Sequence, residues 1–329
     1  KKDIIFLQFQ IKYNNNRQIM DIFVVGASNM DLVSYMSRFP KEGETLHGTK
    51  FETGFGGKGA NQAVMTAKLG GKVGMLSCVG DDSFGTDTIK NYKDNGVDCK
   101  HVHQISNMAT GVAPIFVNEN GENCIVIVNG ANDLVTKQHV HNAKEEISQS
   151  QFVVCQLEIP VEISLEALKV AREVGTKSIF NPAPARSDLP SEMFSLCDII
   201  TPNEPEAELL TGEKVDSTEG AITAAKKLIQ KGCGMVLMTL GSRGCLLLES
   251  EDSEPSFIPV PQQDVTVKDT SGAGDCFIGS LSFFLAKGMP IKEACSRACY
   301  CASISVQSNG TQSSYPNKDQ IPKEMLGSL

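Results

Sequence analysis

The sequence lacks any apolar run near the roughly 20 residues that a membrane-spanning helix needs. It also lacks an excess of positive charge, because 30 Lys and Arg face 39 Asp and Glu, which gives a net charge of −9. A chain of this charge is poorly suited to a nucleic-acid backbone or an anionic membrane surface. We therefore expect no nucleic acid and no membrane among its partners.

Paired cysteines are lacking too. The 11 Cys are scattered, none forms a Cys-x-x-Cys pair, and no group of His lies near them. This argues against a disulfide framework and against a zinc site. Several of them, such as Cys155 in the apolar segment 152–155, are expected to be core residues. Reduced thiols predict a cytoplasmic protein, with the nucleus as a further compartment.

The composition is that of a globular protein. The chain has 329 residues, of which 41% are hydrophobic and 21% charged, enough for one large α/β domain or two smaller ones. Residues 1–19 differ: their apolar stretch is interrupted by Gln8 and Gln10, and no small-residue cleavage site follows it. We expect residues 1–19 to be an N-terminal extension and the fold to begin at Met20.

Short apolar runs typical of buried parallel strands recur along the chain. They span residues 22–25, 73–78, 152–156, 178–180, 198–201 and 235–240. Helical patterns lie between them at 61–69, 164–174 and 219–230, and glycine follows each pattern. This alternation predicts an α/β fold, a mainly parallel sheet with helices on both faces.

One region departs from the alternation. Residues 110–118 and 123–128 flank Asn120-Gly121, a strong hairpin signal. Such a hairpin is either an edge decoration or a lid over an active site. We expect a small separate β-sheet lid from about 33–56 and 109–130, within one domain over 20–329. Its edges and face suit dimerisation.

The most informative segment is residues 269–277. Gly272-Ala273-Gly274 lets backbone N–H groups converge at the start of an apolar helix, which makes an anion hole suited to phosphate. Asp275 would repel phosphate, so its position suits a base that takes a proton from an attacking hydroxyl. The alternative is an ordinary helix start with Asp in its first turn.

Residues 54–59 match Gly-x-Gly-x-x-Gly, but about thirty residues separate them from the first strand, which disfavours dinucleotide binding. No Ser or Thr follows Lys58, so this is not a Walker A loop. We interpret it as a glycine hinge and substrate loop, in which Gly57 lets the backbone approach a ligand and Lys58 and Asn61 supply polar groups.

Polar residues also follow other strands. Asn29 and Asp31 come after the first strand and could bond a vicinal diol, although a capped helix or turn fits equally well. Glu158 follows the strand at 152–156.

Asn203 and Glu206 share one helical face, where Glu206 could hold a metal ion through water; a capping box fits the spacing equally well. Thr239 and the turn 241–244 could line a nucleotide or form a plain turn.

Taken in order, four motifs resemble those of the ribokinases in the carbohydrate kinase family. They are Asn29-x-Asp31, the segment 56–62, Asn203-x-x-Glu206 and the segment 269–275. The resemblance runs from about Met20 to Tyr315, and the segments 181–185 and 310–316 are similar to eukaryotic members. Two departures are Ser271, where Thr is usual, and Pro205, which a first helical turn tolerates.

The resemblance implies a nine-stranded three-layer sandwich with a β lid, dimers through the lids, and transfer of the γ-phosphate of ATP to the 5-hydroxyl of D-ribose. Asp275 would be the base, and Gly272, Ala273 and Gly274 the anion hole. The sugar would contact Asn29, Asp31, Gly57, Lys58, Asn61, Glu158 and Asp275. The nucleotide would contact Asn203, Thr239, Gly241, Gly244 and Gly274.

For metals, the resemblance implies Mg²⁺ near Glu206, through water. It also implies a monovalent cation, K⁺, at Asp269, Ser271, Ser305, Ser308, Gly310 and Ser314, several of them through carbonyls. Two alternatives stay open: another sugar or nucleoside kinase of the same family, and a catalytically silent ribose- and ATP-binding sensor.

Overall fold

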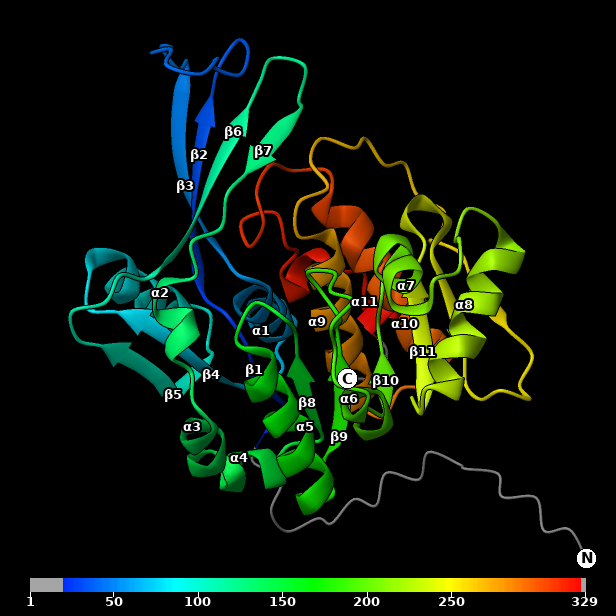
Figure 1. Ribbon diagram of the computed structural model, residues 1–329. Coiled ribbons are helices and arrows are strands. Elements are labelled where there is room, and N and C mark those ends of the chain that lie inside the picture. Colours follow the sequence, from blue (N-terminus) through cyan, green and yellow to red (C-terminus); the bar gives the residue numbers. More distant parts are fainter. Residues whose placement is uncertain (1–19, 327–329) are drawn as a thin grey trace, which may run out of the picture.

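The structure, a computed structural model, describes residues 20–326 (Figure 1). The predicted extension 1–19 lies outside the described residues. Within 20–326 the main sheet has nine strands in the order β13-β12-β11-β10-β9-β8-β1-β4-β5. They are β1 Ile22–Val25, β4 Val73–Gly80, β5 Asp98–Ile105, β8 Phe152–Cys155, β9 Lys177–Phe180, β10 Ile199–Ile200, β11 Met235–Thr239, β12 Cys245–Leu248 and β13 Ser256–Ile258. Neighbours pair in parallel from β5 to β11, whereas β12 and β13 are antiparallel.

Helices cover both faces of this sheet, so the predicted three-layer α/β architecture is confirmed. One face carries α3 Lys137–Asn142, α4 Lys144–Ser148, α5 Val161–Val174, α6 Glu192–Leu196, α7 Glu204–Thr211 and α8 Thr218–Gln230. The other carries α1 Lys58–Lys68, α2 Ser83–Asp94, α9 Ala273–Ala286, α10 Ile291–Ser305 and α11 Lys323–Leu326. The helices predicted at 61–69 and 164–174 start three residues earlier, at Lys58 and Val161. In α1 the first turn contains Lys58 and Gly59, which hide the helical pattern, and in α5 the first turn follows Pro160 directly.

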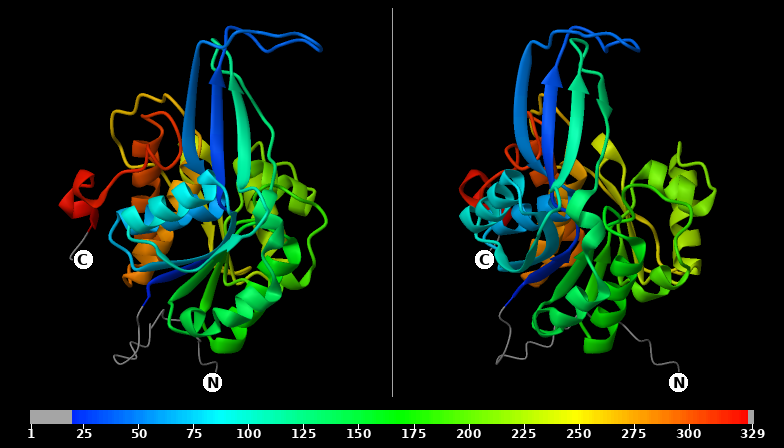
Figure 2. Two further views of the ribbon diagram at one scale, coloured as in Figure 1. Left: turned by 90° about the vertical axis from the view of Figure 1, so that its left-hand side faces the viewer. Right: turned by 60° about the vertical axis from the view of Figure 1, so that its left-hand side comes forward.

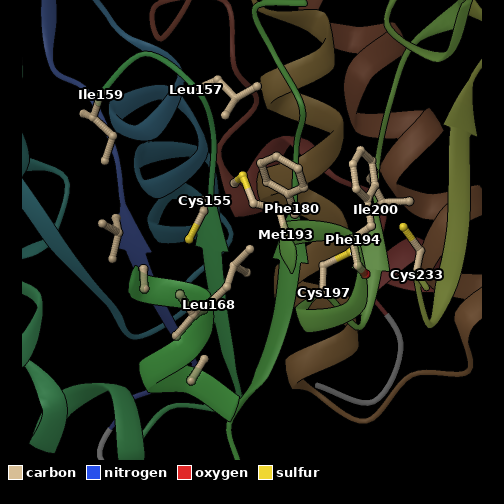
Figure 3. Packing of buried hydrophobic residues seen from close by; sticks show 14 of the residues in the cluster. Cys155, Leu157, Ile159, Leu168, Phe180, Met193, Phe194, Cys197, Ile200 and Cys233 are labelled. Carbon is tan, nitrogen blue, oxygen red and sulfur yellow. The ribbon is translucent and has the colours of Figure 1, made fainter. Parts of the chain in front are cut away.

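The two faces have separate hydrophobic cores, and strand β1 supplies both. Phe23 and Val25 pack into one cluster and Ile22 and Val24 into the other, as the two-residue period of a strand requires. Figure 3 shows part of the first cluster, where Cys155 lies among buried apolar side chains. Its expected role as a core residue is therefore confirmed.

A second sheet stands apart from the body of the molecule (Figure 2). Its strands are β2 Asn29–Tyr35, β3 Lys50–Gly56, β6 Gly111–Val117 and β7 Asn123–Ile125, in the order β3-β2-β6-β7. The predicted hairpin forms β6 and β7. Strand β2 starts at Asn29, before the expected lid boundary near 33, so the alternative of a capped helix or turn for Asn29 and Asp31 was wrong.

The chain adds strands to the main sheet on one side of β1 first and on the other side later. From β1 the chain passes to β4 and β5 on one side, and later to β8 and its successors on the other. The carboxyl ends of β1 and β8 therefore flank a topological switch point, where open α/β sheets bind ligands. Within residues 20–326 we find no helix with the length and apolarity to cross a membrane.

Candidate active site

A cavity of about 180 Å³ lies at the start of helix α9. It is lined by Lys58, Asn181, Ala183, Thr201, Asn203, Glu206, Thr239, Gly272, Gly274, Asp275 and Ile278. Seven of these were predicted as site residues from the sequence. Asn181 and Thr201 were not, although each directly follows a strand, β9 and β10, which is the same signal that drew attention to Asn29.

Asp275 is buried in the first turn of α9, with 6% of its surface exposed. Both carboxylate oxygens accept hydrogen bonds from helix α1. Asn61 Nδ2 donates to Oδ2 and Gln62 Nε2 donates to Oδ1, each at 2.9 Å. Asn61 was a predicted site residue, whereas Gln62 was missed. Asp275 therefore lies in the first turn of a helix, as one of the two alternatives predicted, and its role as a base stays a prediction.

The turn before Asp275 has the geometry of an anion site. Gly272 has a φ of 71°, which glycine adopts readily, and Tyr315 Oη donates to its carbonyl at 2.9 Å. The N–H of Ala273 donates to the Thr270 carbonyl at 3.2 Å. Among the described residues no acceptor takes the N–H groups of Gly272 or Gly274, so these two point to a role in binding an anion.

Charge is concentrated beside Asp275. Lys58 N donates to Glu158 Oε2 at 2.8 Å. Burial lowers the pKa of Lys58, but Asp275, Glu158 and Glu206 outweigh it, so that pKa is raised and the ammonium is held. Burial raises the pKa of Glu158, against the pull of Lys58.

Asp31 lies in the same electrostatic neighbourhood. Burial and then Glu158 raise the pKa of Asp31 to about 7, while Thr311 Oγ1, 3.4 Å from Asp31 Oδ2, acts in the opposite direction. Asp275 adds a smaller upward contribution. Four carboxyl groups and one ammonium thus lie in one electrostatic neighbourhood, an arrangement suited to a ligand with many hydroxyl groups.

Asn29 and Gly57 complete this part of the site. Asn29 lies at the base of the lid, opposite Gly56 of β3 and Gly111 of β6. Gly57 has a φ of 88°, and a Cβ there would lie 2.7 Å from the Ala27 carbonyl oxygen and 2.8 Å from Asn29 N. Only glycine fits this junction between the lid and α1.

Asn203 and Glu206 form a capping box at the start of α7. Asn203 Oδ1 accepts from Glu206 N at 2.8 Å, and Glu206 Oε2 accepts from Asn203 N at 2.9 Å. The capping box is thus confirmed, and because both residues also line the cavity, it leaves room for a role of Glu206 at a metal ion, which stays a prediction. Burial raises the pKa of Glu206 to about 7, against the bond from Asn203 and the charge of Lys58. Thr239 and Asn203 form an isolated parallel β-bridge, which places the two residues side by side.

The two predicted glycines in the turn after β11 lie in different surroundings. Gly241 has a φ of 55° and open space around it, whereas Gly244 is buried, and a Cβ there would lie 2.0 Å from the Ile258 carbonyl oxygen. Neither glycine lines the cavity at α9. Their contact with a nucleotide stays a prediction.

The residues predicted for a monovalent cation lie on the loop before α9, at the end of helix α10, where Ser305 is the last residue, and on the loop that follows α10. Asp269 Oδ1 accepts from Ser271 N at 2.9 Å, and Asp269 Oδ2 accepts from Gly310 N at 2.8 Å. The hydroxyls of Ser305 and Ser314 donate to nearby carbonyls, and Ser308 is exposed. Within residues 20–326 no three His, Cys, Asp or Glu side chains are grouped to hold a metal ion, and the monovalent cation stays a prediction.

Comparisons with known proteins agree with this geometry. The model of the pfkB family of carbohydrate kinases matches residues 20–318. The chain is 46% identical to a ribokinase of Mus musculus, covering 92% of this chain and 93% of that protein. It is 41% identical to a deoxyribokinase of Salmonella typhi, covering 92% and 97%. A solved structure of Arabidopsis thaliana ribokinase complexed with ribose and ATP superposes with a TM-score of 0.87 at 30% identity, covering 93% and 98%.

Proposed function

Because the chain belongs to the pfkB family of carbohydrate kinases, we propose that it is a ribokinase, which transfers the γ-phosphoryl group of ATP to the 5-hydroxyl of D-ribose. The observation that carries the proposal is the position of Asp275. This buried carboxylate lies directly after the anion-binding turn and beside Lys58, in one cavity. Ribose-dependent release of ADP by the purified protein tests the proposal.

The reaction is an in-line phosphoryl transfer. The 5-hydroxyl oxygen forms a bond to the γ-phosphorus, its proton passes to the Asp275 carboxylate, and the bond from the γ-phosphorus to the bridging oxygen of ADP breaks. The N–H groups of Gly272 and Gly274 would stabilise charge on the transferred group. Ala273, whose own N–H donates to the Thr270 carbonyl, would hold the turn that carries them. General-base help from Asp275 is worth roughly 10²–10⁴ in rate.

The nucleotide would bind on the side of the cavity formed by Asn203 and Thr239, with Gly274 as a further contact. Gly241 and Gly244 lie outside this cavity and are proposed as nucleotide contacts from the resemblance of their turn alone. A magnesium ion fits next to Glu206 through water, because burial has raised the pKa of this carboxyl and a cation nearby would offset that cost. When bound, such an ion neutralises charge on the phosphates. Loss of activity on chelation of Mg²⁺, with recovery on its return, is the expected result.

Potassium is the proposed monovalent cation. Support comes from Asp269, whose carboxylate ties the loop at Ser271 to the loop at Gly310, next to the anion-binding turn. Ser305 ends helix α10, and Ser308 and Ser314 lie on the second loop. A cation there would fix the shape of the turn without touching substrate. Activity should fall when KCl is replaced by NaCl or choline chloride, and equal rates in all three salts would exclude this role.

A second candidate substrate is 2-deoxyribose, because one relative of 41% identity is a deoxyribokinase. We favour ribose, since Asn29 and Asp31 lie together at the base of the lid and suit adjacent hydroxyls. A site built to bond a hydroxyl rejects an analogue without it, here by more than about 10²-fold in kcat/KM. Comparable kcat/KM values for both sugars would favour the second candidate.

We also propose a homodimer formed through the lid. Phe51 on the edge strand β3 is 62% exposed. At the other edge of the lid, Ile125, the last residue of β7, and Val126 are 52% and 55% exposed. Exposed apolar side chains at both edges of the lid suit an interaction surface. Sedimentation of Phe51→Glu and Ile125→Glu should show monomers where the natural chain shows dimers.

The cytoplasm is the proposed compartment, supported by the cysteines. Cys78, Cys155 and Cys276 are buried free thiols, as a reducing environment permits. Cell fractionation with antibodies to the protein would test this.

A further inference from the structure

Gln62 contacts Asp275 from a position that no ligand can reach. It is 1% exposed, and both ends of its side-chain amide are bonded. Gln62 Nε2 donates to Asp275 Oδ1 at 2.9 Å and approaches Asn181 Oδ1 at 3.3 Å. Its Oε1 accepts from Gln156 Nε2 at 2.6 Å. Since oxygen and nitrogen each have a partner, the amide has one orientation, with its donor on Asp275.

The two oxygens of Asp275 are therefore held differently. Oδ1 is held by buried Gln62, whereas Oδ2 is held by Asn61, which belongs to the predicted substrate loop. Asn61 is also buried, and its Oδ1 accepts from Gln312 Nε2 at 3.0 Å. Because it is a predicted sugar contact, its Nδ2 would exchange the bond to Oδ2 for one to a sugar hydroxyl. Gln62 has no such alternative. Only Oδ2 can then be released to meet the attacking hydroxyl.

Gln62 reaches Asp275 because helices α1 and α9 approach closely. A Cβ on Gly279 of α9 would lie 2.6 Å from the Gln62 carbonyl oxygen. One turn further along α1, Thr66 Oγ1 donates to the Gly279 carbonyl at 3.0 Å. Thr66 thus joins the same two helices without contacting Asp275, which makes it a matched control.

We propose that Gln62 is a positioning residue that fixes Oδ1 of Asp275, so that Oδ2 is the atom that accepts the proton from the sugar. This inference rests on the proposed function, in which Asp275 is the base. A carboxylate without the Gln62 bond can rotate and move Oδ2 away from the hydroxyl. A misplacement of Oδ2 by about 1 Å lowers the rate by up to about 10²-fold.

The test compares Gln62→Met with Thr66→Val in steady-state ADP release with ribose. Gln62→Met should lower kcat by about 10–10²-fold and change the KM for ribose by less than about threefold. Thr66→Val should keep kcat within about twofold of the natural chain. Gln62→Glu, which keeps the shape of the side chain but loses its donor, should lower kcat at least as much and serves if Gln62→Met fails to fold.

A double variant shows whether Gln62 acts through Asp275. In the Asp275→Ala background, adding Gln62→Met should lower the residual kcat no further, because the group that Gln62 positions is gone. A further fall there, or equal kcat for Gln62→Met and Thr66→Val, would overturn the inference and leave the proposed function standing. A natural chain that releases no ADP with ribose would overturn the proposed function and the inference together.

Discussion

Asn132 Nδ2 donates a hydrogen bond to Asn29 Oδ1 at 2.8 Å, although the two residues lie 103 positions apart in the sequence. Asn132 is 1% exposed, and its own Oδ1 accepts from Ser28 N at 2.9 Å, which fixes the orientation of its amide. The Asn29 amide is thereby oriented as well. Its NH₂ group is left to bind a ligand.

Replacing Asn132 should therefore impair sugar binding. Asn132→Ala is expected to raise the KM for ribose about tenfold, because Asn29 loses its fixed orientation, and to cost about 1–3 kcal/mol in the free energy of unfolding. Steady-state kinetics and urea unfolding measure the two effects. Asn118→Ala, which removes a buried amide from the lid hairpin, is the control and should leave KM unchanged. An unaltered KM in Asn132→Ala would argue against this orienting role.

The two glycines of the anion-binding turn should differ in their effect on stability. Gly272→Ala places a side chain at a φ of 71° and a Cβ 2.6 Å from Tyr315 Oη, so the free energy of unfolding should fall by about 2 kcal/mol. Gly274→Ala meets nothing within 4 Å inside a helix, so stability should be unchanged or up to about 1 kcal/mol higher. Thermal or urea unfolding distinguishes them. Equal losses in both variants would show that the turn is not strained in this way.

Because of Asp31, the free energy of unfolding should fall as the pH rises. Burial raises its pKa from 3.8 to about 7, so the folded protein holds the proton more tightly than the unfolded chain. This contribution is complete below about pH 4 and is lost as the pH rises through about 7. Asp31→Asn has no charge to bury, so it should exceed the natural chain in stability at pH 8, by on the order of 1–3 kcal/mol, and less at pH 5.

Urea unfolding of both chains at the two pH values, without sugar, measures this difference. A stability difference that does not change between pH 5 and pH 8 would count against the buried, proton-binding Asp31. The same variant should bind ribose poorly, because Asp31 is a predicted sugar contact.

The sequence predicted the layers well and some site residues less well, for physical reasons. Apolar periodicity marks buried segments, so β1 was predicted with its observed bounds, whereas α1 starts at Lys58, among glycines of low helix propensity. The first half of strand β2 was missed because it carries polar Asn29 and Asp31, so the lid was expected to begin only near residue 33. Gln62 was missed because nothing in its spacing distinguishes a buried glutamine from a solvated one. Asn203 and Glu206 fitted a helix cap and a site equally, and the structure has them serve as a cap on the wall of the cavity.

The central claim is that Asp275 takes the proton from the attacking hydroxyl. The measurement that tests it most directly is ribose-dependent ADP release by the natural chain and by Asp275→Ala, with ATP binding measured on both by calorimetry. We predict that Asp275→Ala still binds ATP but loses about 10²–10⁴-fold in kcat. A variant that binds ATP and turns over ribose at the rate of the natural chain would contradict the account.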